Sequence, residues 1–159
     1  MTDNKIITDR EELLEAIKND GMAHSSLEYA SDSLKADREV VLAAVKNNPW
    51  AIQYASDSLN ADREFVLEAV KSSSDALEYA SDSLKADREV VLAAIRGHDF
   101  GFGDGEGPLQ YADESLGADR EVVLEAVKQN GYALEYASEE LQNDPELKKL
   151  ASDNSSDFF

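Results

Sequence analysis

The chain contains no cysteine, only three prolines among its 159 residues, and no run of apolar residues long enough to cross a bilayer. The lack of cysteine excludes a disulfide framework, a thiolate nucleophile and the zinc sites that depend on thiolates. A transmembrane helix needs about 18 consecutive apolar residues, so none is expected. The N-terminus has no basic stretch followed by an apolar one, so no secretory signal is expected and a cytoplasmic location is predicted.

Positive charge is also scarce, because 15 lysines and arginines stand against 34 aspartates and glutamates and leave a net charge of -19. A surface of this sign repels phosphates, so direct binding to nucleic acid or to anionic lipid is not expected. The surplus is spread along the chain, which favours solubility or life at high salt. Alternatively, rows of carboxylates could mimic nucleic acid and occupy the basic groove of a DNA- or RNA-binding protein.

What the chain has in abundance is repetition. Copies of a unit of the type LEYASDSLKADREVVLAAV begin at Leu27, Ile52, Leu77, Leu109 and Leu134. Successive copies lie 25 residues apart, except for one step of 32, and a half-unit, TDREELLEAIKND, precedes the first copy. Self-similarity at a short fixed period is typical of a stacked array, in which each unit buries its apolar face against its neighbours.

Each unit predicts two short helices. The second follows an aspartate that can cap free backbone N–H groups, carries a glutamate in its first turn, and ends on lysine or arginine, which suits the helix dipole. These second helices are expected near residues 9–19, 37–47, 62–72, 87–96 and 119–129, with shorter helices around each tyrosine. The predicted fold is therefore all-α, an α-solenoid of two-helix repeats with a 25-residue period.

The ends of the array differ from its middle. When the units are aligned, Glu12 falls in the column of Val40, and Lys148 and Lys149 fall where the other units have valine and leucine. We interpret these residues as polar end caps that keep the protein monomeric. A single helical-repeat domain is expected over residues 1–152, followed by an acidic, disordered tail over residues 153–159.

One column of arginines occupies the first turn of the second helices, where a cation opposes the helix dipole. It consists of Arg10, Arg38, Arg63, Arg88 and Arg120. We expect these arginines to pair with the adjacent aspartate-rich turns, which contain Asp32, Asp57, Asp82 and Asp113. The alternative is a ladder of cations that binds a partner.

The unit A-hydrophobic-x-Y-A-S-x-x-L-x-x-D-R-E-V-V-L-x-A-V resembles a family of tandem two-helix repeats that is described only as a domain of unknown function. That family occurs in bacterial effectors, in phage-like proteins and in protists. The resemblance covers about residues 9 to 152. It implies a helical repeat fold, often used as an accessory module, and no chemistry to carry over.

No group of residues suited to catalysis or metal binding stands out. His24 and His98 are expected in connections between helices, and their spacing does not suit a zinc site. The glycines of GFGDGEG match neither a dinucleotide-binding nor a P-loop pattern. The carboxylates recur in columns, which is typical of a repeated structural role rather than a catalytic pair. We therefore predict a protein that is not an enzyme and binds neither cofactor nor metal.

The extra residues of the long step form an insertion over residues 97–108, and this insertion is the main candidate for partner binding. It offers phenylalanines and carboxylates on a glycine-rich loop, namely Asp99, Phe100, Phe102, Asp104 and Glu106. Trp50 and Tyr132 share one column at a similar turn and are included in the predicted surface. The alternatives are a Ca²⁺ site, although the ligand spacing fails the EF-hand pattern, and an insertion whose phenylalanines pack back onto the stack.

The acidic C-terminus ends in Phe158 and Phe159, which complete the predicted partner-binding set. It loosely resembles the acidic, phenylalanine-terminated tails of bacterial single-strand-binding proteins, which dock into basic pockets. Together these features predict a non-enzymatic protein–protein interaction module on an acidic helical-repeat scaffold, whose partner has a basic surface. The alternative function is an acidic mimic of nucleic acid that inhibits a DNA- or RNA-binding protein.

Overall fold

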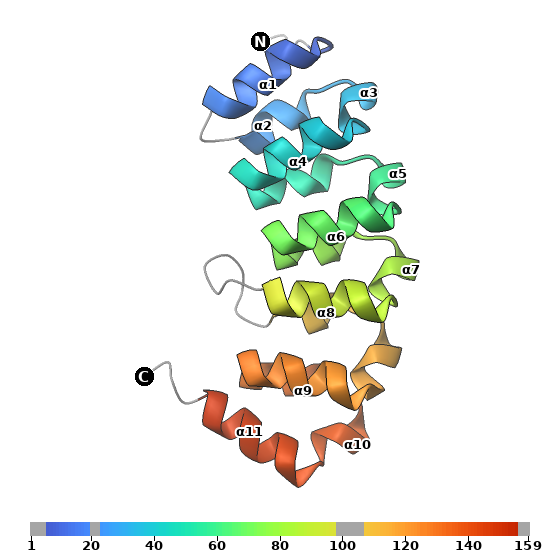
Figure 1. Ribbon diagram of the computed structural model, residues 1–159, viewed down its shortest axis with the longest axis vertical. Helices are drawn as coiled ribbons and strands as arrows, with labels where there is room; N and C mark the ends of the chain where they lie inside the picture. Colours follow the sequence, from blue (N-terminus) through green and yellow to red (C-terminus); the bar gives the residue numbers. More distant parts are fainter. Residues whose placement is uncertain (1–5, 20–22, 98–106, 156–159) are drawn as a thin grey trace, which may run out of the picture.

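The computed structural model describes residues 6–19, 23–97 and 107–155. Within these ranges the regular secondary structure is helical, apart from one isolated parallel bridge between Ile7 and Ala30. The prediction of an all-α protein is confirmed. The helices follow one another in chain order along the longest axis of the molecule (Figure 1).

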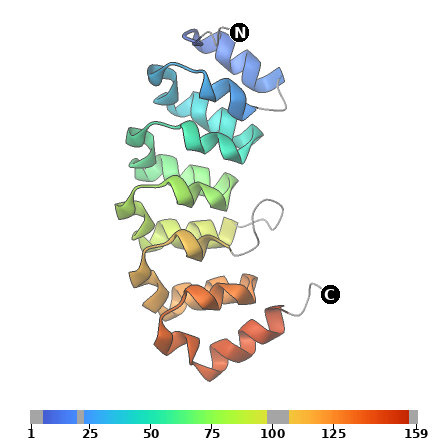
Figure 2. The ribbon, with the colours of Figure 1, turned by 180° about the vertical axis from the view of Figure 1, so that it is seen from behind.

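Each part of the unit occupies its own position in the stack. The long helices form one layer, which consists of α1 (Arg10–Asn19), α4 (Arg38–Asn47), α6 (Arg63–Ser72), α8 (Arg88–Gly97), α9 (Arg120–Gln129) and α11 (Pro145–Ser155). The opposite face, turned toward the viewer in Figure 2, carries α2 (Ala23–Glu28) and the 3-10 helices η1 (Pro49–Tyr54), η2 (Ser74–Tyr79), η3 (Pro108–Tyr111) and η5 (Gly131–Tyr136). Short helices line one edge, namely α3 (Asp32–Lys35), α5 (Asp57–Asn60), α7 (Asp82–Lys85), η4 (Glu114–Ala118) and α10 (Glu139–Gln142).

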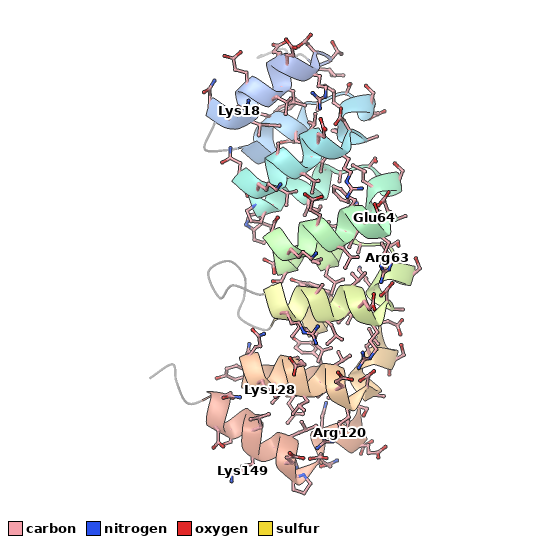
Figure 3. The ribbon with its side chains drawn as sticks, viewed as in Figure 1. Lys18, Arg63, Glu64, Arg120, Lys128 and Lys149 are labelled. Atoms are coloured by element: carbon pink, nitrogen blue, oxygen red, sulfur yellow. The ribbon has the colours of Figure 1, made fainter. Side chains whose placement is uncertain are left out.

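The stack bows gently toward the edge that carries the short helices, which we call the outer edge (Figure 1). The long helices begin at the outer edge and end at the opposite, inner edge. Lys18 and Lys128, in the last turns of α1 and α9, lie toward the inner edge (Figure 3). The two edges therefore present opposite ends of the long helices.

The long helices begin where the sequence predicts, because an aspartate caps the N-terminus. The carboxylate of Asp37 accepts hydrogen bonds from the backbone N–H groups of Glu39 at 3.1 Å and Val40 at 3.2 Å. Asp119 accepts equivalent bonds from Glu121 and Val122. Each cap satisfies donors that have no partner within the helix.

The prediction of one helix around each tyrosine is wrong, because that segment is divided in two. The 3-10 helix η1 ends at Tyr54, the backbone at Ala55 and Ser56 is extended, and α5 then begins. The extended backbone lets the N–H of Ser56 donate to the carbonyl of Lys35 in the preceding unit, at 2.9 Å. The same bond recurs from Ser81 to Asn60, from Asp113 to Lys85 and from Ser138 to Gly117. Each unit from η1 onward thus contains a 3-10 helix, a short helix and a long helix, and the first unit has the α-helix α2 in place of the 3-10 helix.

The apolar side chains of the long helices form one continuous core between the two layers. Val40, Val41 and Val45 of α4 are fully or almost fully buried, and Phe65 of α6 is the largest of the fully buried side chains. At the ends of the stack, Glu12 and the lysines Lys148 and Lys149 are exposed, as expected for polar caps. Burial of the apolar stripes therefore holds helices of only ten residues in place.

The last two units approach each other closely through two glycines. A β-carbon on Gly131 would lie 2.1 Å from the carbonyl oxygen of Ala151, and one on Gly117 would lie 2.6 Å from that of Tyr136. The last helix, α11, also continues to Ser155, beyond the predicted start of the tail, and Asn154 donates a side-chain hydrogen bond to the carbonyl of Val127 at 3.0 Å. The C-terminal end of the stack is therefore a packed helix up to Ser155.

Candidate functional site

The arginine column does not pair with the aspartates that the sequence suggested. Each of four arginines pairs instead with the capping aspartate of the long helix in the following unit. The pairs are Arg10–Asp37 at 2.9 Å, Arg63–Asp87 at 2.7 Å, Arg88–Asp119 at 2.8 Å and Arg120–Asp144 at 3.6 Å. The same guanidinium groups also contact the glutamates two residues further on, namely Glu39, Glu89, Glu121 and Glu146.

This arginine ladder runs along the outer edge, where Figure 3 shows Arg63 and Arg120. Arg38 is the exception, because it pairs with Glu64 at 3.7 Å and Glu68 at 3.4 Å. The last described long helix, α11, has Pro145 in the arginine position. The ladder therefore joins successive units, and its guanidinium groups are engaged within the chain.

The ladder also changes the acidity of the caps. The hydrogen bond from Arg63 lowers the pKa of Asp87 below its ordinary value, although partial burial opposes the shift. Arg88 lowers the pKa of Asp119 in the same way. Because the folded state favours the charged carboxylates, these caps stabilise the protein most when they are ionised.

We expect Asp87→Asn to destabilise the protein modestly, because asparagine can still cap α8 but offers Arg63 no charge. Asp87→Ala also removes the cap on the N–H groups of Glu89 and Val90, with a further loss of about 1 kcal/mol. The contribution of the ion pair is complete above the ordinary aspartate pKa of 3.8 and is lost as the pH falls through the lowered folded value. Urea unfolding should therefore show the gap between wild type and Asp87→Asn closing on acidification. A gap that does not change with pH would argue against the ion pair.

Of the predicted partner-binding residues, the structure describes Trp50 and Tyr132. The others lie outside the described residues, namely Asp99, Phe100, Phe102, Asp104, Glu106, Phe158 and Phe159. The insertion leaves from Gly97 at the inner end of α8 and returns at Gly107, whose φ of +83° favours glycine. The described part of the candidate site is therefore the scaffold on either side of the insertion.

Trp50 and Tyr132 occupy equivalent places in the first turns of η1 and η5. The backbone N–H of each donates to an asparagine side chain, from Trp50 to Asn48 and from Tyr132 to Asn130, both at 3.0 Å. The tryptophan is 47% exposed and the tyrosine 49% exposed. In each case the capping hydrogen bond fixes the backbone of the turn. The large aromatic side chain on that turn therefore presents its apolar area to solvent from a fixed position.

Sequence reasoning did not recognise a further set of residues as a site, although it showed that a tyrosine recurs at one position of every unit. We call these residues the tyrosine column, and they are Tyr29, Tyr54, Tyr79, Tyr111 and Tyr136. We define the aromatic face as the surface of α2, η1, η2, η3 and η5, together with Tyr29 directly after α2 (Figure 2). All six tyrosines and the single tryptophan of the chain belong to it, namely Tyr29, Trp50, Tyr54, Tyr79, Tyr111, Tyr132 and Tyr136. Tyr29 is exposed, and the other tyrosines of its column are half-buried.

Carboxylates accompany the phenol groups of this face. Burial raises the pKa of the Tyr54 hydroxyl, and the nearby Glu28 carboxylate raises it further. Burial and the charges of Glu78 and Asp75 raise the pKa of Tyr79. A negative potential therefore surrounds these tyrosines.

A depression between the last two units lies where the aromatic face meets the outer edge. Its walls include Tyr136 and the carboxylates Asp113, Glu114 and Glu139. An aromatic ring beside several carboxylates is suited to an organic cation, because the ring face and the charges attract it together.

No group of three or more His, Asp or Glu side chains that could hold a metal ion occurs among the described residues. The prediction that His24 lies in a connection is wrong, because α2 already begins at Ala23. None of the helices in the described ranges is long and apolar enough to cross a membrane.

The chain was compared with protein families, with curated proteins and with solved structures. A family model described as a domain of unknown function (DUF4116) matches residues 9–60, 62–116, 104–142 and 119–152. No curated protein and no solved structure matches the chain. The family matches follow one another along most of the sequence and repeat, in agreement with the repeated units. The chain therefore belongs to this family, the domain of unknown function DUF4116.

Proposed function

We propose that this chain is a non-enzymatic protein–protein interaction module, built as a monomeric α-solenoid with a 25-residue period and polar end caps. The exposure of Trp50 and Tyr132 carries the proposal. Tyrosine and tryptophan are enriched at the centres of protein interfaces, because they bury much area while losing little conformational freedom. The net charge of -19 favours a partner with a basic surface.

The scaffold supports this role because it fixes the aromatic side chains relative to one another. Backbone hydrogen bonds and the arginine ladder join successive units along the outer edge. Trp50 and Tyr132 therefore lie on a surface whose units are fixed relative to one another. The insertion connects α8 to η3, and both of these elements lie between the units of Trp50 and Tyr132. Residues on a loop carried by a rigid scaffold lose less entropy on binding than those of a free peptide.

A nucleic-acid mimic is the second candidate, and a feature of the outer edge favours it. Each short helix carries an acidic residue in its first turn, namely Asp32, Asp57, Asp82, Glu114 and Glu139. Lys35 and Lys85 interrupt this row in two of the units, which makes it a poorer copy of a phosphate backbone. For that reason we place the interaction module first.

The test is capture of partners from a lysate of the source cells with tagged wild type and with Trp50→Ser/Tyr132→Ser. We expect the double variant to lose a partner that wild type retains. The matched control is Ile6→Ser, which removes an apolar side chain that is 62% exposed at the N-terminal end of the stack. If the double variant, at an unchanged melting temperature, captures the same proteins as the wild type, the proposal is wrong. Release of the partner by added DNA or RNA would favour the mimic.

The insertion is tested in the same assay by deleting residues 99–105, which restores the 25-residue step between Leu77 and Leu109. The shorter loop should preserve the melting temperature, because each doubling of loop length costs only about 0.6 kcal/mol. Binding should weaken if the insertion contacts the partner. A fall of many degrees would assign the phenylalanines to the core instead.

A further inference from the structure

The charged residues of this protein are segregated between its faces. None of its 15 lysines and arginines lies in the described elements α2, η1, η2, η3 and η5, whereas all of its tyrosines and its tryptophan lie on the face that these elements form. Glu28, Asp75, Glu78 and Glu135 belong to the same elements. The aromatic face therefore combines aromatic residues and carboxylates with, in these elements, no lysine or arginine.

We infer that the aromatic face binds an extended polypeptide segment that carries arginine or lysine at about every third residue. This inference rests on the proposed function and names its partner class and surface. The rings offer their negative faces to the cations, and the adjacent carboxylates pair with the same groups.

The depression beside Tyr136 illustrates the contact. A guanidinium group placed there lies beside Tyr136 and within reach of Asp113, Glu114 and Glu139. Arginine suits such a place because its planar group stacks on aromatic rings and donates to carboxylates at the same time. Two other half-buried tyrosines repeat the combination, because Glu28 lies near Tyr54 and Glu78 lies near Tyr79.

The spacing of the tyrosine column along the aromatic face favours an extended segment. Neighbouring packed helices lie about 10 Å apart, so one tyrosine follows the next at roughly this interval. A chain in the polyproline II conformation advances about 9 Å in three residues. The tyrosine column also continues past the insertion, because η3 contacts both η2 and η5. A segment of about a dozen residues would therefore place one cation on each of four successive units.

Other occupants fit the face less well. Nucleic acid and anionic lipid would meet carboxylates with no lysine or arginine in the described elements of the face. A second copy of this chain is net acidic, and its arginine ladder is already paired within the molecule. An apolar helix would take the carboxylates of Glu28 and Glu78 out of water and offer them no charge in return.

The experiment uses the full chain and a fluorescein-labelled peptide of four Arg-Pro-Pro triplets, with binding followed by fluorescence anisotropy. The comparison peptides are an isomer with the four arginines in one block and a peptide of Glu-Pro-Pro triplets. We expect the periodic arginine peptide to bind at least about fivefold more tightly than its isomer, and the glutamate peptide not to bind.

The variant Tyr29→Leu/Trp50→Leu removes two exposed rings and should weaken binding of the periodic peptide about tenfold. The matched variant Tyr29→Phe/Trp50→Phe retains aromatic faces and should bind almost as the wild type does. Melting temperatures confirm that both are folded. The control Glu11→Gln/Glu15→Gln removes two exposed charges from α1, in the layer of long helices, and should have little effect.

Equal binding of the two arginine peptides overturns the inference, as does a loss of binding that is larger in Glu11→Gln/Glu15→Gln than in Tyr29→Leu/Trp50→Leu. These results would mean diffuse attraction to acidic residues elsewhere. If a cellular partner requires Trp50 and Tyr132 but is not displaced by the periodic peptide, the inference fails while the proposed function stands. If the peptide binds as expected and no partner depends on those residues, the proposed function fails instead.

Discussion

Replacing Phe65 by alanine is expected to lower the free energy of unfolding by about 3–5 kcal/mol. Phe65 has no exposed surface, and no fully buried side chain of the described structure is larger. Alanine would remove most of this apolar surface and leave a cavity. The surrounding helices can close it only in part, because α6 packs on both α4 and α8.

Valine at the same position provides the matched comparison, because the equivalent residues of other long helices are Val40, Val90 and Val122. Phe65→Val should therefore be tolerated better than Phe65→Ala. Urea denaturation followed by circular dichroism measures both. Equal losses, or a loss below about 1 kcal/mol for alanine, would mean that the core around α6 collapses freely onto the missing ring.

Gly131→Ala is expected to destabilise the C-terminal end by about 1–3 kcal/mol, because its methyl group has no room. The added β-carbon would lie 2.1 Å from the carbonyl oxygen of Ala151 and 2.2 Å from the hydroxyl oxygen of Ser155. Relief requires α11 to move as a body, since the closest atom belongs to its backbone. We expect a lower melting temperature and faster hydrogen exchange in α11.

Gly97→Ala serves as the control, because its β-carbon would lie 3.1 Å from the carbonyl oxygen of Val70 and needs only a small adjustment. Its effect should be clearly smaller than that of Gly131→Ala. If both variants have the same melting temperature as the wild type, α11 does not pack on η5 as closely as described.

The long helices could be predicted from sequence because the residues that determine where each helix begins and ends are close to it in the chain. The capping aspartate, the first-turn glutamate and the terminal lysine lie within one helix, so local physical chemistry is sufficient to place it. The break between η1 and α5 could not be placed in the same way. Its cause is the hydrogen bond from Ser56 to Lys35, which joins residues from different units.

The arginine ladder shows a similar limit. The sequence indicated that arginines would pair with aspartates, but Arg63 reaches Asp87 in the next unit rather than a nearby turn. Which aspartate an arginine contacts depends on the offset between stacked helices, and the repeat length alone does not give this offset. The aromatic face was missed because the 3-10 helices that carry the tyrosines lie side by side only in the folded stack (Figure 2). The insertion residues lie outside the described part of the chain, so their role stays a prediction.

The restriction of close packing to neighbouring units has a mechanical consequence. Every extensive contact between described elements joins elements of the same unit or of adjacent units. Within the described part of the chain, a molecule pulled from its two ends therefore has no extensive contact between distant units that must break before the rest can yield. Force should detach one unit at a time and give a series of similar, low rupture peaks, with the end units released first. The same property makes the protein an extensible element, whose length under load changes in steps of one unit.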